Sequence, residues 1–278
     1  TYYSVNLNKV QTDDARNYNL NDYLNGTAVV SGQPISTFYS YKFLGLNPQN
    51  GAPMFDDWED RWHLLQGKTL DEVVPMILVN SGTRDPKFSG DLNNTFTYKN
   101  WSLSLNFSYS LGSKVRLFEM YGPIINGISA AANVREEFLD RWQVPGDEKY
   151  TVYPLIISPS SPDYEHYRLH YSAPQRAVGP NSGVPAFANN VWQMYDDSDL
   201  RVVSGNYLKL QSLSFSYRLN DRLLRKTPFT QLSISFNTHN CFTISAKELR
   251  GQDPSQAGFA DAGLSIRPSY TIGLNVSF

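Results

Sequence analysis

His166 and His170 have the spacing of two metal ligands on one helix face, because residues four apart lie one above the other on a helix. A metal site also needs further ligands, and none lies close to this pair in the sequence. The segment is rich in proline, which argues against a helix there. His63 and His239 are isolated and fit structural roles better. We therefore expect no bound metal.

The remaining groups that could do chemistry are equally incomplete. Asp196, Asp197 and Asp199 form an acidic cluster, but a calcium loop requires glycine at its sixth position and glutamate at its twelfth. A solvated loop explains this cluster better. The segment 127–131 (GISAA) lacks the last glycine of a nucleophile elbow, and Cys241 fits a small residue of a sheet. The sequence thus predicts no catalytic residue, no cofactor and no enzymatic activity.

The composition of the chain indicates which classes of protein to consider. Its 278 residues include 24 Lys and Arg against 26 Asp and Glu, so a basic surface for nucleic acid is not indicated. A single cysteine excludes a disulfide framework. No apolar run is long enough for a transmembrane helix. Aromatic residues make up 14% of the chain and charged residues only 18%, which favours a β-rich protein.

Strict alternation of apolar and small polar residues is the clearest pattern in the chain. In Trp101–Leu111 every second residue is apolar and the residues between are serine or asparagine. Because successive side chains of a strand point to opposite faces, this stretch has one apolar and one polar face. Lys99 and Asn100 precede it as a tight hairpin turn. The same alternation recurs at 92–98, 208–219, 232–237 and 270–278.

The connections between these stretches are strongly unequal in length. The turns at 99–100 and 220–229 are short, whereas the connection 112–205 is long and 245–268 is moderate. Short turns on one side and long loops on the other are typical of outer-membrane barrels. Within the long connection, an apolar stripe predicts a helix over 130–142. The parity of the apolar residues switches at Gln211–Ser212, which predicts a β-bulge if both halves face the same medium.

A series of short motifs runs in order along nearly the whole chain. The motifs are 43–48 (FLGLNP), 50–53 (NGAP), 85–90 (DPKFSG), 96–103 (FTYKNWSL), 141–142 (RW), 145–147 (PGD), 200–203 (LRVV), 206–210 (NYLKL), 213–217 (LSFSY), 240–242 (NCF) and 251–254 (GQDP). This ordered series resembles the C-terminal part of SusC/RagA-type TonB-linked outer-membrane transporters of Bacteroidetes. Lys209 and Cys241 depart from the residues that are commoner in that family, arginine and leucine, without threatening a strand.

This resemblance implies a fold and a function for the chain. The fold class is all-β, an antiparallel transmembrane β-barrel in which residues 1–278 form the C-terminal portion of about 22 strands. The connection 112–205 would be an extracellular loop region, and the plug domain would lie outside this chain. The function implied is import of oligosaccharides or peptides across the outer membrane of a Gram-negative bacterium, with glycan favoured by its frequency in the family. The partners implied are a SusD-like surface lipoprotein, TonB acting through the plug, outer-membrane lipid and the barrel-assembly machinery.

Two further sets of residues carry specific predictions. The final strand, 269–278, resembles the C-terminal signal that outer-membrane assembly machinery recognises, and its residues are Tyr270, Ile272, Leu274, Val276 and Phe278. Aromatic side chains outside the strands could stack on a substrate, and the candidates are Trp58, Trp62, Tyr164, Tyr167 and Trp192. Packing within the loops and a membrane-interface belt are the alternatives for these aromatics.

A carbohydrate-binding β-sandwich without transport activity is the rival interpretation, because its strands would alternate in the same way. The two interpretations differ in what the apolar faces contact. In a sandwich, Leu103, Phe107, Phe215 and Ile272 are buried between two sheets, whereas in a barrel they form an uncovered outward band.

Overall fold

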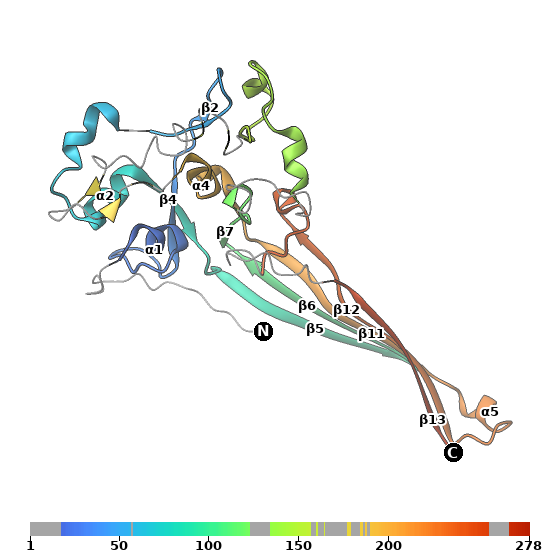
Figure 1. Ribbon diagram of the computed structural model, residues 1–278. Helices are drawn as coiled ribbons and strands as arrows, with labels where there is room; N and C mark the ends of the chain where they lie inside the picture. Colours follow the sequence, from blue (N-terminus) through green and yellow to red (C-terminus); the bar gives the residue numbers. More distant parts are fainter. Residues whose placement is uncertain are drawn as a thin grey trace.

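Five long antiparallel strands form one sheet, and most of the other described elements form a cap at one end of it (Figure 1). These features come from a computed structural model. It describes residues 18–56, 58–122, 134–156, 160, 164, 177–178, 184–185, 187, 190–255 and 267–278. The strand order is β13-β12-β11-β6-β5. The bounds are β5 Phe88–Tyr98, β6 Trp101–Leu111, β11 Tyr207–Arg218, β12 Gln231–Ser245 and β13 Ser269–Ser277.

The register of the sheet confirms the predicted bulge. Leu210 lies opposite Phe107 of β6, Ser212 lies opposite Asn106, and Gln211 is the extra residue between them. The insertion shifts the parity of β11 by one, so apolar residues before and after it reach the same face. The predicted hairpin at Lys99 and Asn100 is also present, with Tyr98 directly opposite Trp101. Lys99 has the left-handed φ of 53° that a two-residue hairpin turn commonly requires.

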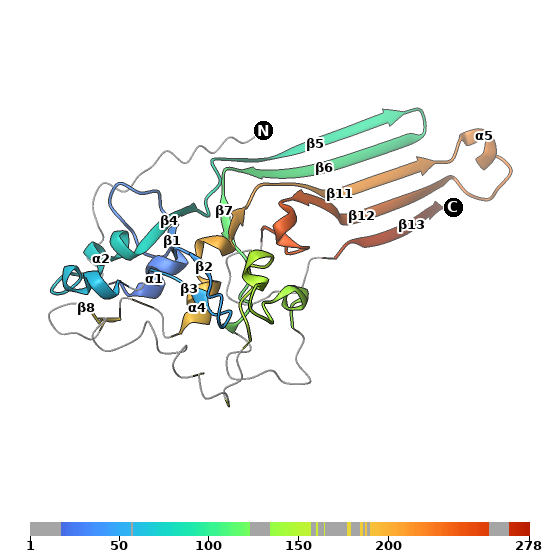
Figure 2. The same cartoon turned by 90° about the horizontal axis from the view of Figure 1, so that it is seen from above.

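Both short connections and the C-terminus lie at the end of the sheet away from the cap (Figure 2). The connection between β11 and β12 contains the short helix α5, Asp221–Leu224, which projects beyond the strand ends. The side chain of Asn220 caps this helix by accepting a hydrogen bond from the backbone N–H of Arg222 at 3.0 Å. The distribution of connection lengths predicted from the sequence is therefore present in the described part of the chain.

The cap is continuous with the sheet, because its strands run directly into the long ones. β4 ends at Thr83 shortly before β5, β7 begins at Lys114 after β6, and β10 ends at Ser204 before β11. β1 pairs with β4, β7 pairs with β10 and β2 pairs with β3. The cap elements are α1 Leu20–Asn25, β1 Thr37–Tyr41, β2 Gly45–Leu46, β3 Pro53–Met54, η1 Glu59–Leu64, α2 Leu70–Ile77, β4 Leu78–Thr83, β7 Lys114–Arg116, η3 Glu136–Asp140, η4 Asp147–Lys149, β8 Ala177–Val178, β9 Val184–Pro185, α4 Val191–Asp196, η6 Asp199–Arg201, β10 Val202–Ser204 and η7 Lys247–Leu249.

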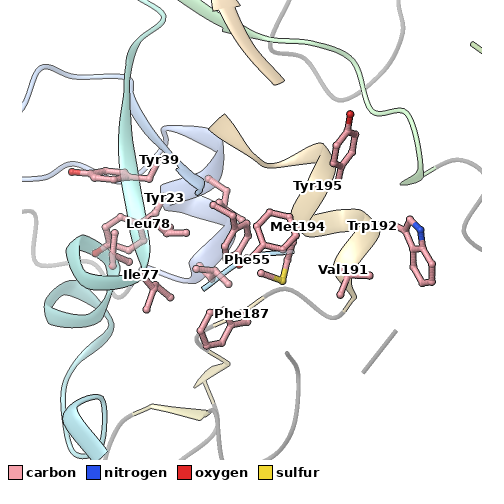
Figure 3. Close-up of a cluster of buried hydrophobic side chains, with 14 of the residues drawn as sticks. Tyr23, Tyr39, Phe55, Ile77, Leu78, Phe187, Val191, Trp192, Met194 and Tyr195 are labelled. Atoms are coloured by element: carbon pink, nitrogen blue, oxygen red, sulfur yellow. The ribbon is translucent and has the colours of Figure 1, made fainter. Parts of the chain in front are cut away.

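One apolar core holds the cap together. Side chains from α1, β1, α2, β4 and α4 meet there, with Tyr23, Tyr39, Leu78 and Met194 almost fully buried (Figure 3). These segments are distant in sequence, so burial of their apolar surface is what brings them together. None of the described helices is long and apolar enough to cross a membrane.

Two predictions of local structure need correction. Of the helix predicted over 130–142, the described residues 134–142 contain only a short 3-10 helix, η3, and their apolar side chains do not form one face. Phe138 and Trp142 are buried, whereas Leu139 is 73% exposed. The stretch 38–46 is strand-like in its sequence, but the structure divides it into β1 and β2, which belong to the cap and not to the long sheet.

Candidate functional site

The two faces of the five-stranded sheet differ sharply in chemistry. One row of directly opposed residues across all five strands is entirely apolar, and we call it the apolar row: Phe96, Leu103, Phe215, Phe236 and Ile272. The next row, which points to the other face, is the polar row: Thr95, Ser104, Ser214, Asn237 and Thr271. Adjacent rows of a pleated sheet face opposite sides, so the apolar row and the polar row lie on opposite faces.

The apolar row is left uncovered by the described part of the chain. Ile272 is 80% exposed and Phe96 is 59% exposed, and the neighbouring outward residues Tyr270 and Leu274 are similarly open. A contiguous exposed apolar surface of this kind marks a contact with a membrane or with another protein. The β-sandwich interpretation required burial of these side chains between two sheets, and the exposure of Phe215 and Ile272 contradicts it.

Hydrogen bonds between small side chains organise the opposite face. Thr95 Oγ1 lies 3.0 Å from Ser104 Oγ, and the hydroxyl of Ser214 donates to Oδ1 of Asn237 at 2.6 Å. Lys209 lies on the same face nearer the cap, where its Nζ is 2.9 Å from Oδ2 of Asp253. Both side chains of this ion pair are almost fully buried. This face suits the lining of a lumen, because it is polar and carries little charge.

Asp196 holds the backbone of a neighbouring segment in the cap. Its Oδ1 accepts from the N–H of Met120, and its Oδ2 accepts from the N–H groups of Tyr121 and Gly122, each at 2.8 Å. Burial raises the pKa of Asp196, while Arg201 and these three donors favour the charged form and limit the rise. The carboxylate therefore fixes the segment 120–122 against the end of α4.

Asp197 belongs to a second buried polar contact. Its Oδ1 lies 3.0 Å from Nη1 of Arg116, whose guanidinium also donates to the carbonyl of Leu24 at 2.7 Å and that of Tyr39 at 2.7 Å. Burial raises the pKa of Asp197 to about 6, although the charge of Arg116 opposes this effect. The prediction that Asp196, Asp197 and Asp199 form a solvated loop is wrong, because the first two satisfy buried N–H donors. Asp199 also has a structural role, because its Oδ1 accepts a hydrogen bond from the backbone N–H of Phe43 at 3.0 Å.

Sequence reasoning missed Arg116 for a definable reason. The signal was a single cation inside the short apolar run 115–118 (VRLF). A charged residue in such a run is buried only if it is paired, and its partners lie up to 92 residues away. Neither periodicity nor spacing could identify them.

The aromatic candidates for substrate contact lie mainly in the cap core. Trp58 is buried, Trp62 packs against the same core, and Tyr164 stacks on Trp192 with ring centroids 5.8 Å apart. Only small parts of Trp58, Tyr164 and Trp192 reach the surface, which favours the packing alternative. Tyr167 lies outside the described residues. A role of these aromatics in substrate binding stays a prediction.

The other candidate groups contribute no site in the described residues. His166, His170 and the segment 127–131 lie outside them. Among the described residues, no three potential ligand side chains are grouped to hold a metal. Cys241 is a free thiol at the irregular part of β12, with its Sγ 3.1 Å from Oγ1 of Thr238.

The proposed assembly signal forms the edge strand β13. Tyr270, Ile272, Leu274 and Phe278 are exposed on the apolar face, and Val276 is half-buried. Phe278 touches Phe229 edge to face, with centroids 5.3 Å apart. The alternation thus reaches the last residue in the structure as it does in the sequence, while the role of this strand in assembly stays a prediction.

Comparison with known proteins relates this architecture to one class of transporter. No protein-family model matches the chain. A curated relative, TonB-dependent receptor P3 of Formosa agariphila, is 23% identical over 269 residues, which cover 89% of this chain and 22% of that protein. The solved structure of the RagAB peptide transporter shares the fold with a TM-score of 0.55 at 15% identity, over 90% of this chain and 24% of that one.

A second solved structure, the RagAB peptide importer in its closed-closed state, gives a TM-score of 0.55 at 16% identity, over 95% of this chain and 25% of that one. The chain thus spans about a quarter or less of the length of the proteins it matches. The predicted resemblance is confirmed: in sequence and in fold, the chain is similar to a portion of a SusC/RagA-type TonB-dependent transporter.

Proposed function

We propose that this chain is part of the barrel wall and the external cap of a SusC/RagA-like TonB-dependent importer in the outer membrane of a Gram-negative bacterium. The observation that carries the proposal is the separation of the sheet into an exposed apolar row and a hydrogen-bonded polar row. In this proposal lipid covers the apolar row and water fills the lumen beside the polar row. The strands of 9 to 15 residues reach the length that a tilted membrane strand needs.

The remaining parts of the transporter lie outside this chain in our proposal. The chain is the C-terminal portion of a closed barrel of about 22 strands, whose plug receives TonB. A SusD-like surface lipoprotein closes the barrel from outside, above the cap. The chain contributes wall and cap only, does no covalent chemistry and needs no cofactor. Cargo is an oligosaccharide or a peptide, and the name of the RagAB peptide transporter supports the peptide.

A pair of adjacent substitutions in β6 tests the membrane location. Leu105 points to the apolar face and Ser104 to the polar face. An arginine facing lipid near the membrane midplane costs about 2–4 kcal/mol, whereas a lumen-facing arginine is solvated. In the full-length protein we expect Leu105→Arg to reduce the outer-membrane fraction that keeps a heat-modifiable mobility in detergent gels, and Ser104→Arg to leave it near wild type. Equal insertion of both variants would exclude a lipid-facing apolar row.

Uptake measurements test the transport function separately from the fold. Cells that lack the gene should lose import of labelled oligopeptides or labelled oligosaccharides, and a protonophore should abolish the same import in wild-type cells. The labelled compound whose import is lost identifies the class of cargo. Unchanged import of both, in cells where the protein is correctly inserted, would contradict the importer function.

A further inference from the structure

Basic side chains gather at the end of the sheet away from the cap. The connection 219–230 holds three cations, Arg222, Arg225 and Lys226, against the single carboxylate of Asp221, although the whole chain carries a net charge of −2. Lys99 in the neighbouring hairpin turn is a fourth cation. All four cations are exposed.

These cations have no protein counterion among the described residues. The ion pairs of that part of the chain involve other cations, namely Lys42, Arg61, Arg116, Arg135 and Lys209. Exposed like charges that lie close together repel one another, so a surface of this kind favours an anionic partner.

The aromatic residues beside these turns indicate where the cations lie relative to a membrane. Tyr98, Trp101 and Tyr217 face each other directly across β5, β6 and β11 on the apolar side. The ring centroids of Trp101 and Tyr217 are 4.2 Å apart, and Nζ of Lys99 lies 5.1 Å from the ring centroid of Tyr98. Tyrosine and tryptophan rings concentrate where hydrocarbon meets headgroups. The cations therefore begin at the level of the headgroups.

The helix α5 adds an apolar contact at the same level. Leu224 is buried and fixes the turn, whereas Leu223 is 57% exposed next to Arg222. An exposed leucine between cations is the combination that interfacial membrane segments use, with the apolar side chain between lipid tails and the cations at the headgroups. A purely aqueous, electrostatic contact gives no reason for the exposed leucine.

From the charge, the aromatic row and Leu223 together, we infer that the α5 turn and Lys99 bind anionic phospholipid headgroups at the inner surface of the membrane. This inference rests on the proposed function, because it requires the sheet to span a bilayer with its short turns on the inner side. The lipid enrichment comes from charge attraction and falls as salt rises.

Local lipid composition around the turn tests this inference on the full-length protein in lipid nanodiscs. A bimane probe attached to Thr230→Cys, in a background without other cysteines, reports on the headgroups beside the turn. We compare its quenching by nitroxide-labelled phosphatidylglycerol and by nitroxide-labelled phosphatidylcholine. At low salt we expect the anionic lipid to quench the probe at least about threefold more strongly than the neutral lipid. One cation close to an anionic surface gives about a fivefold preference, so the combined effect of the four exposed cations should exceed this threshold.

A matched pair of charge variants assigns the effect to the turn. Arg222→Gln, Arg225→Gln and Lys226→Gln together should bring the quenching ratio close to one. Lys149→Gln, Lys247→Gln and Arg250→Gln remove the same charge from exposed residues at the cap end and should leave the ratio unchanged. An equal ratio in wild type and in the turn variant, or an equal fall in both variants, overturns the inference.

Three further readouts keep the outcomes distinct. The first is the salt dependence of the quenching ratio in the wild-type protein. A ratio that does not fall as NaCl is raised from about 0.05 M to 0.5 M contradicts an electrostatic contact. Loss of heat-modifiable mobility in the wild-type protein would instead reject the proposed function itself. Binding to isolated peptidoglycan by wild type but not by the turn variant, without lipid enrichment, would assign the cations to the cell wall and overturn the lipid contact.

Discussion

Nη1 of Arg116 lies 3.0 Å from Oδ1 of Asp197, although 81 residues separate the two in the sequence. The same guanidinium donates to Oγ of Ser40 at 2.8 Å and to the carbonyl oxygens of Tyr39 in the same strand and of Leu24 in α1. Arg116 ends β7, which follows directly from the long strand β6. This single side chain therefore joins the cap to the sheet that we place in the membrane.

Replacement of Arg116 by lysine should loosen the cap. Lysine keeps the charge but has no planar fork to reach Leu24, Tyr39 and Asp197 together, so buried acceptors lose their donor. We expect a loss of about 3 kcal/mol in local stability, measured as faster hydrogen–deuterium exchange in β1 and α4 of the full-length protein. The control is Arg61→Lys at an exposed ion pair with Asp56, which should change exchange by less than about 1 kcal/mol. Equal effects of the two variants would contradict the role of Arg116.

The pH dependence of the cap should carry the signature of Asp197. Its pKa of about 6 in the folded state lies above the value of about 3.9 in an unfolded chain. The folded state thus binds the proton more tightly, so this group adds stability as pH falls from 7 through 6 toward 4, and that contribution is lost as pH rises again. Asp197→Asn cannot titrate and should lack it.

The measurement is the difference in exchange protection of α4 between wild type and Asp197→Asn at several pH values. As pH falls from 7 to 4, the protection of α4 in wild type should increase relative to that in Asp197→Asn. The increase should be no more than about 3 kcal/mol. A shift in the opposite direction would show that Arg116 dominates over burial and lowers the pKa of Asp197.

The sheet could be predicted from the sequence because its information is local. Each strand is encoded by strict alternation, as in Trp101–Leu111, and alternation alone fixes which side chains share a face. The bulge at Gln211 was predictable for the same reason, because a one-residue insertion leaves a visible change of parity. Lys99 and Asn100 marked their turn by their position between two alternating runs.

The cap could not be predicted because its contacts are between residues far apart in sequence. Asp196 holds N–H groups 74 to 76 residues away, and nothing in the sequence around either partner specifies the other. The stripe through Phe138 and Trp142 matched a helical period, yet the two residues pack from a 3-10 turn and an irregular segment. Tertiary burial determined these local structures more than periodicity did.

The ion pair between Lys209 and Asp253 should behave as a coupled unit. Although burial opposes it, hydrogen bonds from Ser255 and Lys209 lower the pKa of Asp253. Removing one partner leaves a buried charge without compensation, so Lys209→Met or Asp253→Asn alone should cost about 3 kcal/mol in the protection of residues 243–255. The double variant should cost at least about 1 kcal/mol less than the sum of the two. Simple additivity in exchange measurements would show that the two charges do not interact.

Deletion of Phe278 should lower the amount of correctly assembled protein in the outer membrane. Phe278 is 85% exposed, so its removal opens no cavity, and its described ring contact is with Phe229. β13 is the edge of the sheet, and a free edge is where pairing with another strand begins. Loss of the terminal aromatic should therefore impair recognition of this strand more than the stability of the finished sheet.

The control for this deletion is Ser277→Ala, which changes the neighbouring residue on the opposite face and keeps the terminal aromatic. We expect several-fold less heat-modifiable protein in the outer-membrane fraction for the deletion and a wild-type amount for the control. The purified deletion variant, once inserted, should unfold at nearly the wild-type temperature, because an exposed side chain contributes little to stability. Unchanged yield would remove Phe278 from the assembly signal. A low yield with an equally lowered unfolding temperature would mean that the ring stabilises the strand end through Phe229 instead.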